Sequence, residues 1–142
     1  MGDIITFLVE PVPKGRPRFH VFNGRVSTFT PRKTRVYESD IAEMYVNQRG
    51  KKYDAGVPLE VLVNFYMPIP KRASKIMRSH MQNGYIKHTK KPDVDNLTKA
   101  LLDALNGIAF ADDAQIVRLS AQKMYAEVPR IELLIKVAGG EM

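Results

Sequence analysis

The chain has 142 residues, 44% of them hydrophobic and 26% charged, which is an ordinary globular composition with room for one domain over residues 1–142. The absence of cysteine excludes disulfide bonds and thiolate zinc sites, and no signal-peptide pattern or membrane-length apolar run is present, so we expect a cytoplasmic protein. The net charge of +7 and the pI of about 9.7 favour a partner that is a phosphate polymer.

The first half of the chain predicts two strands and one helix. Residues 4–9 are apolar and rich in β-formers, which predicts a strand, whereas residues 13–19 contain too much proline and glycine for a helix and predict an ordered loop or an irregular edge strand. Thr30 and Pro31 predict an N-cap followed by proline at the first helical position, and apolar residues at helical spacing continue this helix to about Arg49. Residues 59–66 predict the second strand.

The second half predicts two helices and two closing strands. Residues 73–82 favour a short basic helix, and residues 96–108 form the clearest helix because their apolar residues make one stripe. Residues 116–124 and 130–137 predict the last two strands. Since strands and helices are interspersed, we expect a mixed α+β fold, with a mixed β-sheet flanked by helices.

Basic residues gather in two parts of the sequence. Residues 71–91 carry seven lysines and arginines and no acidic residue, and three cations alternate along the N-terminal loop, where they can grip successive phosphates. An ordinary solvated basic surface is the alternative. Phe19 and Phe22 can stack on bases, although core packing is the better expectation. The candidate DNA-binding residues are Lys14, Arg16, Arg18, Arg32, Lys33, Lys71, Arg72, Lys75, Arg78, Lys90 and Lys91.

Acidic residues follow the second basic segment directly. Pro92 prevents a helix from continuing through it, so Asp93 and Asp95 lie at or just before a helix N-terminus, where both carboxylates can converge on one hard cation. Lys99 follows Asp95 by one helical turn and can point toward the same place. If the strand beginning near residue 116 packs beside this helix, Asp112 or Asp113 can reach the same site.

Clustered carboxylates beside a basic segment favour metal-dependent phosphodiester hydrolysis. Carboxylate-bound Mg²⁺ can activate water and stabilise the departing oxygen, and a nearby lysine can stabilise charge on the phosphate. Each feature also has a structural alternative: Asp93 or Asp95 can cap the helix, Asp112-Asp113 can be a solvated turn, and Asp103 is expected to form an exposed pair with Lys99.

Taken together, these residues resemble the RusA family of Holliday junction resolvases of bacteria and prophages. The most specific part is Asp-x-Asp-Asn-Leu-x-Lys at residues 93–99, followed by Asp-Asp-x-Gln at residues 112–115. The other matching segments, in the expected order, are residues 13–18, Thr30-Pro31 with Tyr37-Glu38, and residues 102–107.

The resemblance implies a homodimeric endonuclease that makes paired symmetric cuts across a four-way DNA junction during recombination and repair. It implies that Asp93, Asp95, Lys99 and Asp113 are catalytic, and that Asp93, Asp95 and Asp113 bind Mg²⁺, with Asp112 assisting. Mn²⁺ is an alternative metal. The competing functions are a nuclease for flaps or other branched DNA and a branched-DNA-binding protein without cleavage. An RNA-binding ribosomal-type protein would explain the charge but not the acidic residues.

Overall fold

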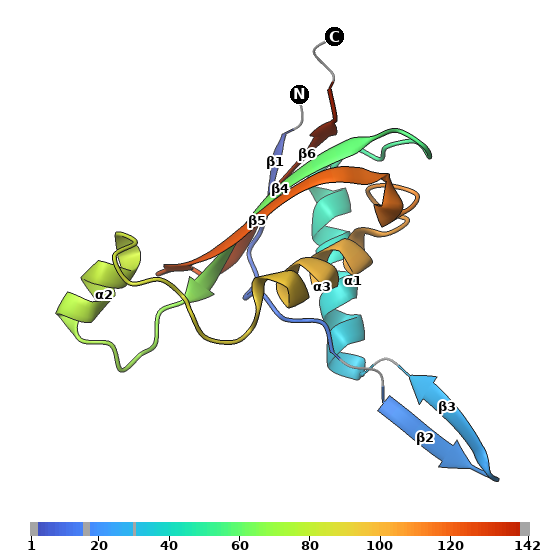
Figure 1. The fold of residues 1–142 in the computed structure, drawn as a ribbon, viewed down its shortest axis with the longest axis horizontal. Helices are drawn as coiled ribbons and strands as arrows, with labels where there is room; N and C mark the ends of the chain where they lie inside the picture. Colours follow the sequence, from blue (N-terminus) through green and yellow to red (C-terminus); the bar gives the residue numbers. More distant parts are fainter. Residues whose placement is uncertain (1–2, 16–17, 30, 140–142) are drawn as a thin grey trace.

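A four-stranded mixed sheet forms the centre of the protein, in the order β1-β6-β4-β5 (Figure 1). The computed structural model describes residues 3–15, 18–29 and 31–139. β4 and β5 are parallel, which requires a crossover connection, and the segment between them contains two α-helices and a short 3₁₀ helix; the other pairs are antiparallel. The sheet consists of β1 (Ile4–Phe7), β4 (Leu59–Pro68), β5 (Ile116–Ala126) and β6 (Arg130–Val137).

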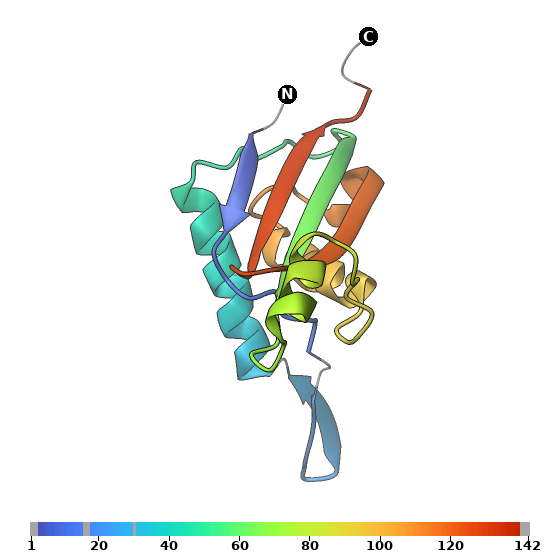
Figure 2. The ribbon, with the colours of Figure 1, turned by 90° about the vertical axis from the view of Figure 1, so that its left-hand side faces the viewer.

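Helices α1 (Arg32–Asn47) and α3 (Val94–Leu105) cover one face of this sheet (Figures 1 and 2). The apolar stripe of α3 is buried, with Leu97, Leu101 and Leu105 fully inaccessible, and it belongs to the same hydrophobic core as alternate residues of β4. Helix α2 (Lys75–Gln82) lies at the end of β4 and β5, where Met81 packs against Tyr125. The predicted mixed α+β fold is therefore confirmed.

A β-hairpin, β2 (Arg18–Phe22) and β3 (Arg25–Phe29), projects away from the sheet and was not predicted (Figures 1 and 2). Its turn is Asn23-Gly24, and both residues have positive φ angles, of 52° and 74°. Asn-Gly between β-formers is the strongest short-range hairpin signal, so the sequence contained the information. The side chain of Phe22 is 68% exposed, so the expectation of core packing is wrong for it; the side chain of Phe19 lies outside the described residues.

Helix boundaries differ slightly from the predicted ones. Pro31 is the N-cap of α1 rather than its first helical residue, and Thr30 lies outside the described residues. Helix α3 begins at Val94 and ends at Leu105. It ends there because Gly107, with a φ of 78°, turns the chain, and the N–H of Gly107 donates to the carbonyl of Phe110 at 2.8 Å. Among the described residues, no helix combines the length and apolar character needed to cross a membrane.

Candidate active site

A pocket of about 430 Å³ lies between α3, the short 3₁₀ helix η1 (Asp113–Gln115) and β5. It contains three of the residues singled out from the sequence, Asp95, Lys99 and Asp113, although Asp113 is distant from the other two along the chain. The remaining lining residues are Val94, Thr98, Leu102, Leu119 and Ala121. Two carboxylates and an ammonium group therefore share a pocket whose other walls are largely apolar.

Helix α3 presents Asp95 and Lys99 to this pocket because they lie one turn apart. Asp93 is the N-cap residue of α3, but its side chain makes no capping hydrogen bond and is exposed. Asp93 therefore occupies the capping position, as the structural alternative expected, but its side chain does not cap the helix. The carboxylates of Asp93 and Asp95 both lie at the N-terminal end of α3, where the helix dipole stabilises negative charge.

Lys123 of β5 fixes the turn that leads into α3. Its ammonium group donates to the carbonyl of Lys90 at 2.6 Å and to the carbonyl of Pro92 at 2.9 Å. Lys123 therefore ties the sheet to the backbone that immediately precedes Asp93. Sequence reasoning did not single out Lys123, and no local pattern identifies a lysine whose partners are two carbonyl groups on another segment.

The neighbouring residues Asp112 and Asp113 have different surroundings. Asp112 is the N-cap of η1, and its carboxylate accepts from the N–H of Ala114 at 3.0 Å. Gln115 completes a capping box by accepting from the N–H of Asp112 at 3.1 Å. Separately, the Gln115 side chain donates to the carbonyl of Val57 at 3.0 Å. This bonding holds η1 against the loop before β4, while Asp113 lines the pocket.

The electrostatics of the acidic pair also distinguish its two members. The pKa of Asp113 is raised, first by desolvation and then by the carboxylates of Asp112 and Asp103, while Lys99 opposes the shift. The pKa of Asp112 is lowered, chiefly by the hydrogen bond from Ala114 and then by Asp113. Negative charge therefore accumulates around Asp113, and a bound cation would relieve it.

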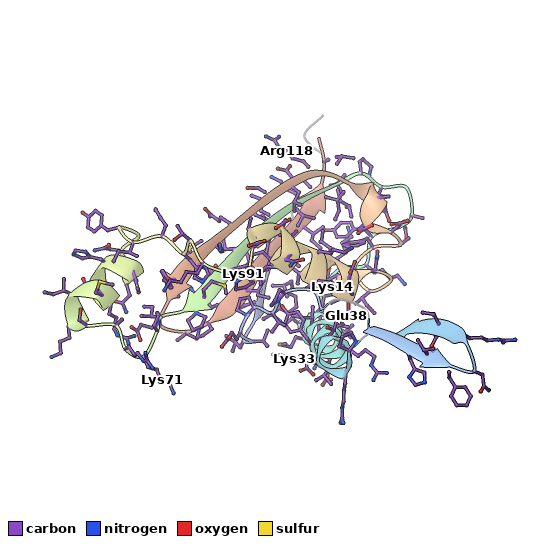
Figure 3. The ribbon with its side chains drawn as sticks, turned by 60° about the horizontal axis from the view of Figure 1, so that its bottom comes forward. Lys14, Lys33, Glu38, Lys71, Lys91 and Arg118 are labelled. Carbon is purple, nitrogen blue, oxygen red and sulfur yellow. The ribbon has the colours of Figure 1, made fainter. Side chains whose placement is uncertain are left out.

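The predicted DNA-binding cations fall into two groups. Lys14 and Arg78 are partly buried and form ion pairs, Lys14 with Glu38 at 3.1 Å and Arg78 with Glu127 at 2.9 Å. The backbone of Arg16 and the side chain of Arg18 lie outside the described residues. The others are exposed; Figure 3 shows three of them, Lys33 at the start of α1, Lys71 before α2 and Lys91 before α3. The exposed cations are Arg32, Lys33, Lys71, Arg72, Lys75, Lys90 and Lys91.

The donor set suits Mg²⁺ held jointly with a substrate. In residues 3–15, 18–29 and 31–139, no three carboxylate or imidazole side chains lie close enough together to hold a metal ion by themselves. Mg²⁺, however, is usually bound by one or two carboxylates together with water and substrate phosphate. Asp95 and Asp113 line the same pocket from different elements, and their oxygens are the ligands that this ion prefers.

Comparison with known proteins agrees with the motifs. The family model described as endodeoxyribonuclease RusA matches residues 9–136. The uncharacterized protein YqaN of Bacillus subtilis is 38% identical over 138 residues, covering 94% of this chain and 96% of that protein. The crossover junction endodeoxyribonuclease rusA of Lactococcus phage r1t is 30% identical over 113 residues, covering 79% of each chain.

Proposed function

This chain belongs to the RusA family of endodeoxyribonucleases, and we propose that it resolves Holliday junctions by Mg²⁺-dependent, paired and symmetric hydrolysis of two phosphodiester bonds. The observation that carries the proposal is the pocket shared by Asp95, Lys99 and Asp113 in a chain with a net charge of +7. A protein that only bound DNA would gain nothing from carboxylates in such a pocket, since they repel phosphate.

The acidic residues of the site would bind the metal ion, and its lysine would stabilise the phosphate. Asp95 and Asp113 would hold Mg²⁺, with Asp93, which precedes α3 directly, as a third ligand and Asp112 to assist. When bound, this ion supplies a polarised water and neutralises charge on the leaving oxygen. Lys99 brings a fixed positive charge to the same pocket and would stabilise the charge that develops on the attacked phosphate.

Exposed cations would bind the phosphates of the DNA substrate. The seven exposed lysines and arginines around α1, α2 and the start of α3 are available to bind phosphates. A homodimer is part of the proposal because a two-fold junction presents two equivalent strands, and two active sites must cut them symmetrically. We place this activity in the cytoplasm, where bacterial and phage DNA recombine.

The test uses a purified immobile four-way junction labelled in turn on each strand. With Mg²⁺, the unaltered protein is expected to give paired symmetric nicks. The unaltered protein with EDTA and the Asp95→Asn variant with Mg²⁺ should give none. Glu60→Gln is the matched control, because Glu60 is paired with Arg118 and Lys136 at 3.8 Å and lies on the sheet face opposite α3. A DNA flap and a linear duplex are assayed in parallel as comparison substrates.

Each outcome selects one function. Cleavage of the flap in preference to the junction would replace the resolvase with a nuclease for other branched DNA. Junction binding without cleavage, with Mn²⁺ and several crossover sequences also tried, would favour a branched-DNA-binding protein. Cleavage that persists in Asp95→Asn would refute the proposed site.

A further inference from the structure

A chain of ion pairs connects the N-terminal loop to the candidate active site. The ammonium group of Lys14 lies 3.1 Å from the carboxylate of Glu38 on α1 and 3.0 Å from Oδ2 of Asp103 on α3. The same Oδ2 lies 3.7 Å from the ammonium group of Lys99. Figure 3 shows Lys14 beside Glu38 where the N-terminal loop passes between α1 and α3. The predicted pair of Asp103 with Lys99 is present, but the nearer partner of Asp103 is Lys14.

The loop that carries Lys14 is held tightly in this position. The N–H of Lys14 donates to the carbonyl of Asn96 on α3 at 3.3 Å. The neighbouring Gly15 packs so closely on Thr34 of α1 that a side chain at this position would collide with the Thr34 hydroxyl. The backbone at residues 14 and 15 is therefore fixed between the two helices, and the ammonium group of Lys14 has little freedom to leave its two carboxylates.

The inner members of the chain are more buried than an ordinary surface ion pair. The side chains of Lys14, Glu38 and Asp103 are 22%, 24% and 21% exposed, whereas Lys99 is 64% exposed. Exposed pairs contribute little because solvent screens them and long side chains lose entropy when they are held. Burial reduces that screening for Lys14, Glu38 and Asp103, so three partly buried groups support the exposed Lys99.

The charges of these four residues balance only with the Asp103 carboxylate in place. Two carboxylates face two ammonium groups, and one oxygen of Asp103 lies between Lys14 and Lys99. Without this oxygen the two lysines would repel each other, and the more exposed Lys99 would move. Asp103 is therefore the acidic partner of Lys99, the one cation among the described residues that line the pocket.

We propose that Lys14, Glu38 and Asp103 form a positioning network that holds the Lys99 ammonium group at the pocket shared with Asp95 and Asp113. Asp103 is the residue that contacts Lys99, and Lys14 and Glu38 keep Asp103 in place. The inference rests on the proposed function for its effect on cleavage, but not for its effect on Lys99. It assigns Lys14 a structural task in place of the phosphate contact expected from the sequence.

The experiment measures Lys99 and the reaction separately. In protein labelled with carbon-13 at lysine Cε, the Lys99 signal, assigned with Lys99→Arg, is expected to show two inequivalent methylene protons. Asp103→Asn should merge them into an averaged signal. The same variant should slow single-turnover junction cleavage about tenfold to a hundredfold, the cost of misplacing a reacting group by about an ångström, while junction affinity in EDTA stays unchanged.

Further variants separate positioning from general damage. Glu38→Gln removes the outermost partner and should reproduce both effects more weakly, which keeps the test valid if Asp103→Asn does not fold. Asp103→Glu should restore part of the cleavage rate. Glu60→Gln, with a side chain 19% exposed and two cationic partners, should change neither readout.

The failure of this inference differs from that of the proposed function. If the Lys99 signal is the same in the unaltered protein, Asp103→Asn and Glu38→Gln, the network does not hold Lys99, whatever happens to cleavage. If the unaltered protein cuts no branched DNA, the proposed function is wrong, while the Lys99 signal still decides whether the network exists.

Discussion

Replacing Lys123 with methionine is expected to destabilise the protein by about 2 kcal/mol, since its two hydrogen bonds join β5 to the turn before α3. The donor is charged and the distances to the Lys90 and Pro92 carbonyls are 2.6 and 2.9 Å. Hydrogen bonds to charged groups contribute about 1.5–3 kcal/mol each. Two would give about 3–6 kcal/mol, but Lys123 is only half-buried and water can replace it at both carbonyls, so we expect a smaller loss.

Thermal unfolding followed by circular dichroism measures this loss. For a chain of this length, about 2 kcal/mol corresponds to a fall in Tm of roughly 6 °C. Lys136→Met is the matched control, because Lys136 lies on β6 of the same sheet, separated from β5 by β4, and its contact with Glu60 is a looser ion pair of 3.8 Å with 41% exposure. That variant should lose less than about 0.5 kcal/mol. Equal falls in Tm for the two variants would refute the reasoning.

Three further predictions concern pH, salt and metal. The pKa of His88 is lowered by desolvation and then by Lys123, so the unfolded chain binds its proton more readily. The contribution of neutral His88 to the free energy of unfolding is therefore present above pH 6.5 and is lost as pH falls toward the lower folded pKa. His88→Phe should flatten the dependence of Tm on pH in this range, and an unchanged dependence would contradict the prediction. Lys71→Ala should reduce the slope of log affinity against log salt by about 0.9, and Lys14→Ala should leave this slope unchanged, as fluorescence anisotropy on a junction at several salt concentrations would reveal. Mg²⁺ should raise the Tm of the unaltered protein but not that of Asp113→Asn, because an ion that binds only the folded state stabilises it; equal shifts would place the ion elsewhere.

Much of the fold was predictable because its signals are local. The run at residues 59–66 predicted β4, and the apolar stripe at helical spacing predicted α3, within a few residues of their bounds. The hairpin was not predicted, although Asn23-Gly24 is a typical hairpin turn, because the proline- and glycine-rich residues 13–19 before it favoured a loop or an irregular edge strand. The exposure of Phe22 depends on how far the hairpin projects, which no local pattern encodes.

The candidate site was predictable only in part. The spacing of Asp95 and Lys99 put them on one face of a helix, because that relation depends on helical geometry alone. Their convergence with Asp113 required β5 to pack beside α3, which was stated from the sequence only as a condition. Lys123 was not anticipated, since its partners are carbonyl groups that any residue could supply.

By itself the sequence determined the charge of the chain, the type of most of its elements and the motifs of its family, because composition and periodicity act over short stretches of chain. Only the tertiary structure decided which cations face solvent and which are neutralised within the protein. Lys14 and Lys71 are the same residue type in two basic segments, yet one lies between two carboxylates and the other is exposed. The physical reason is that an ion pair depends on distance through space, and the folded chain alone brings Glu38 and Asp103 to Lys14.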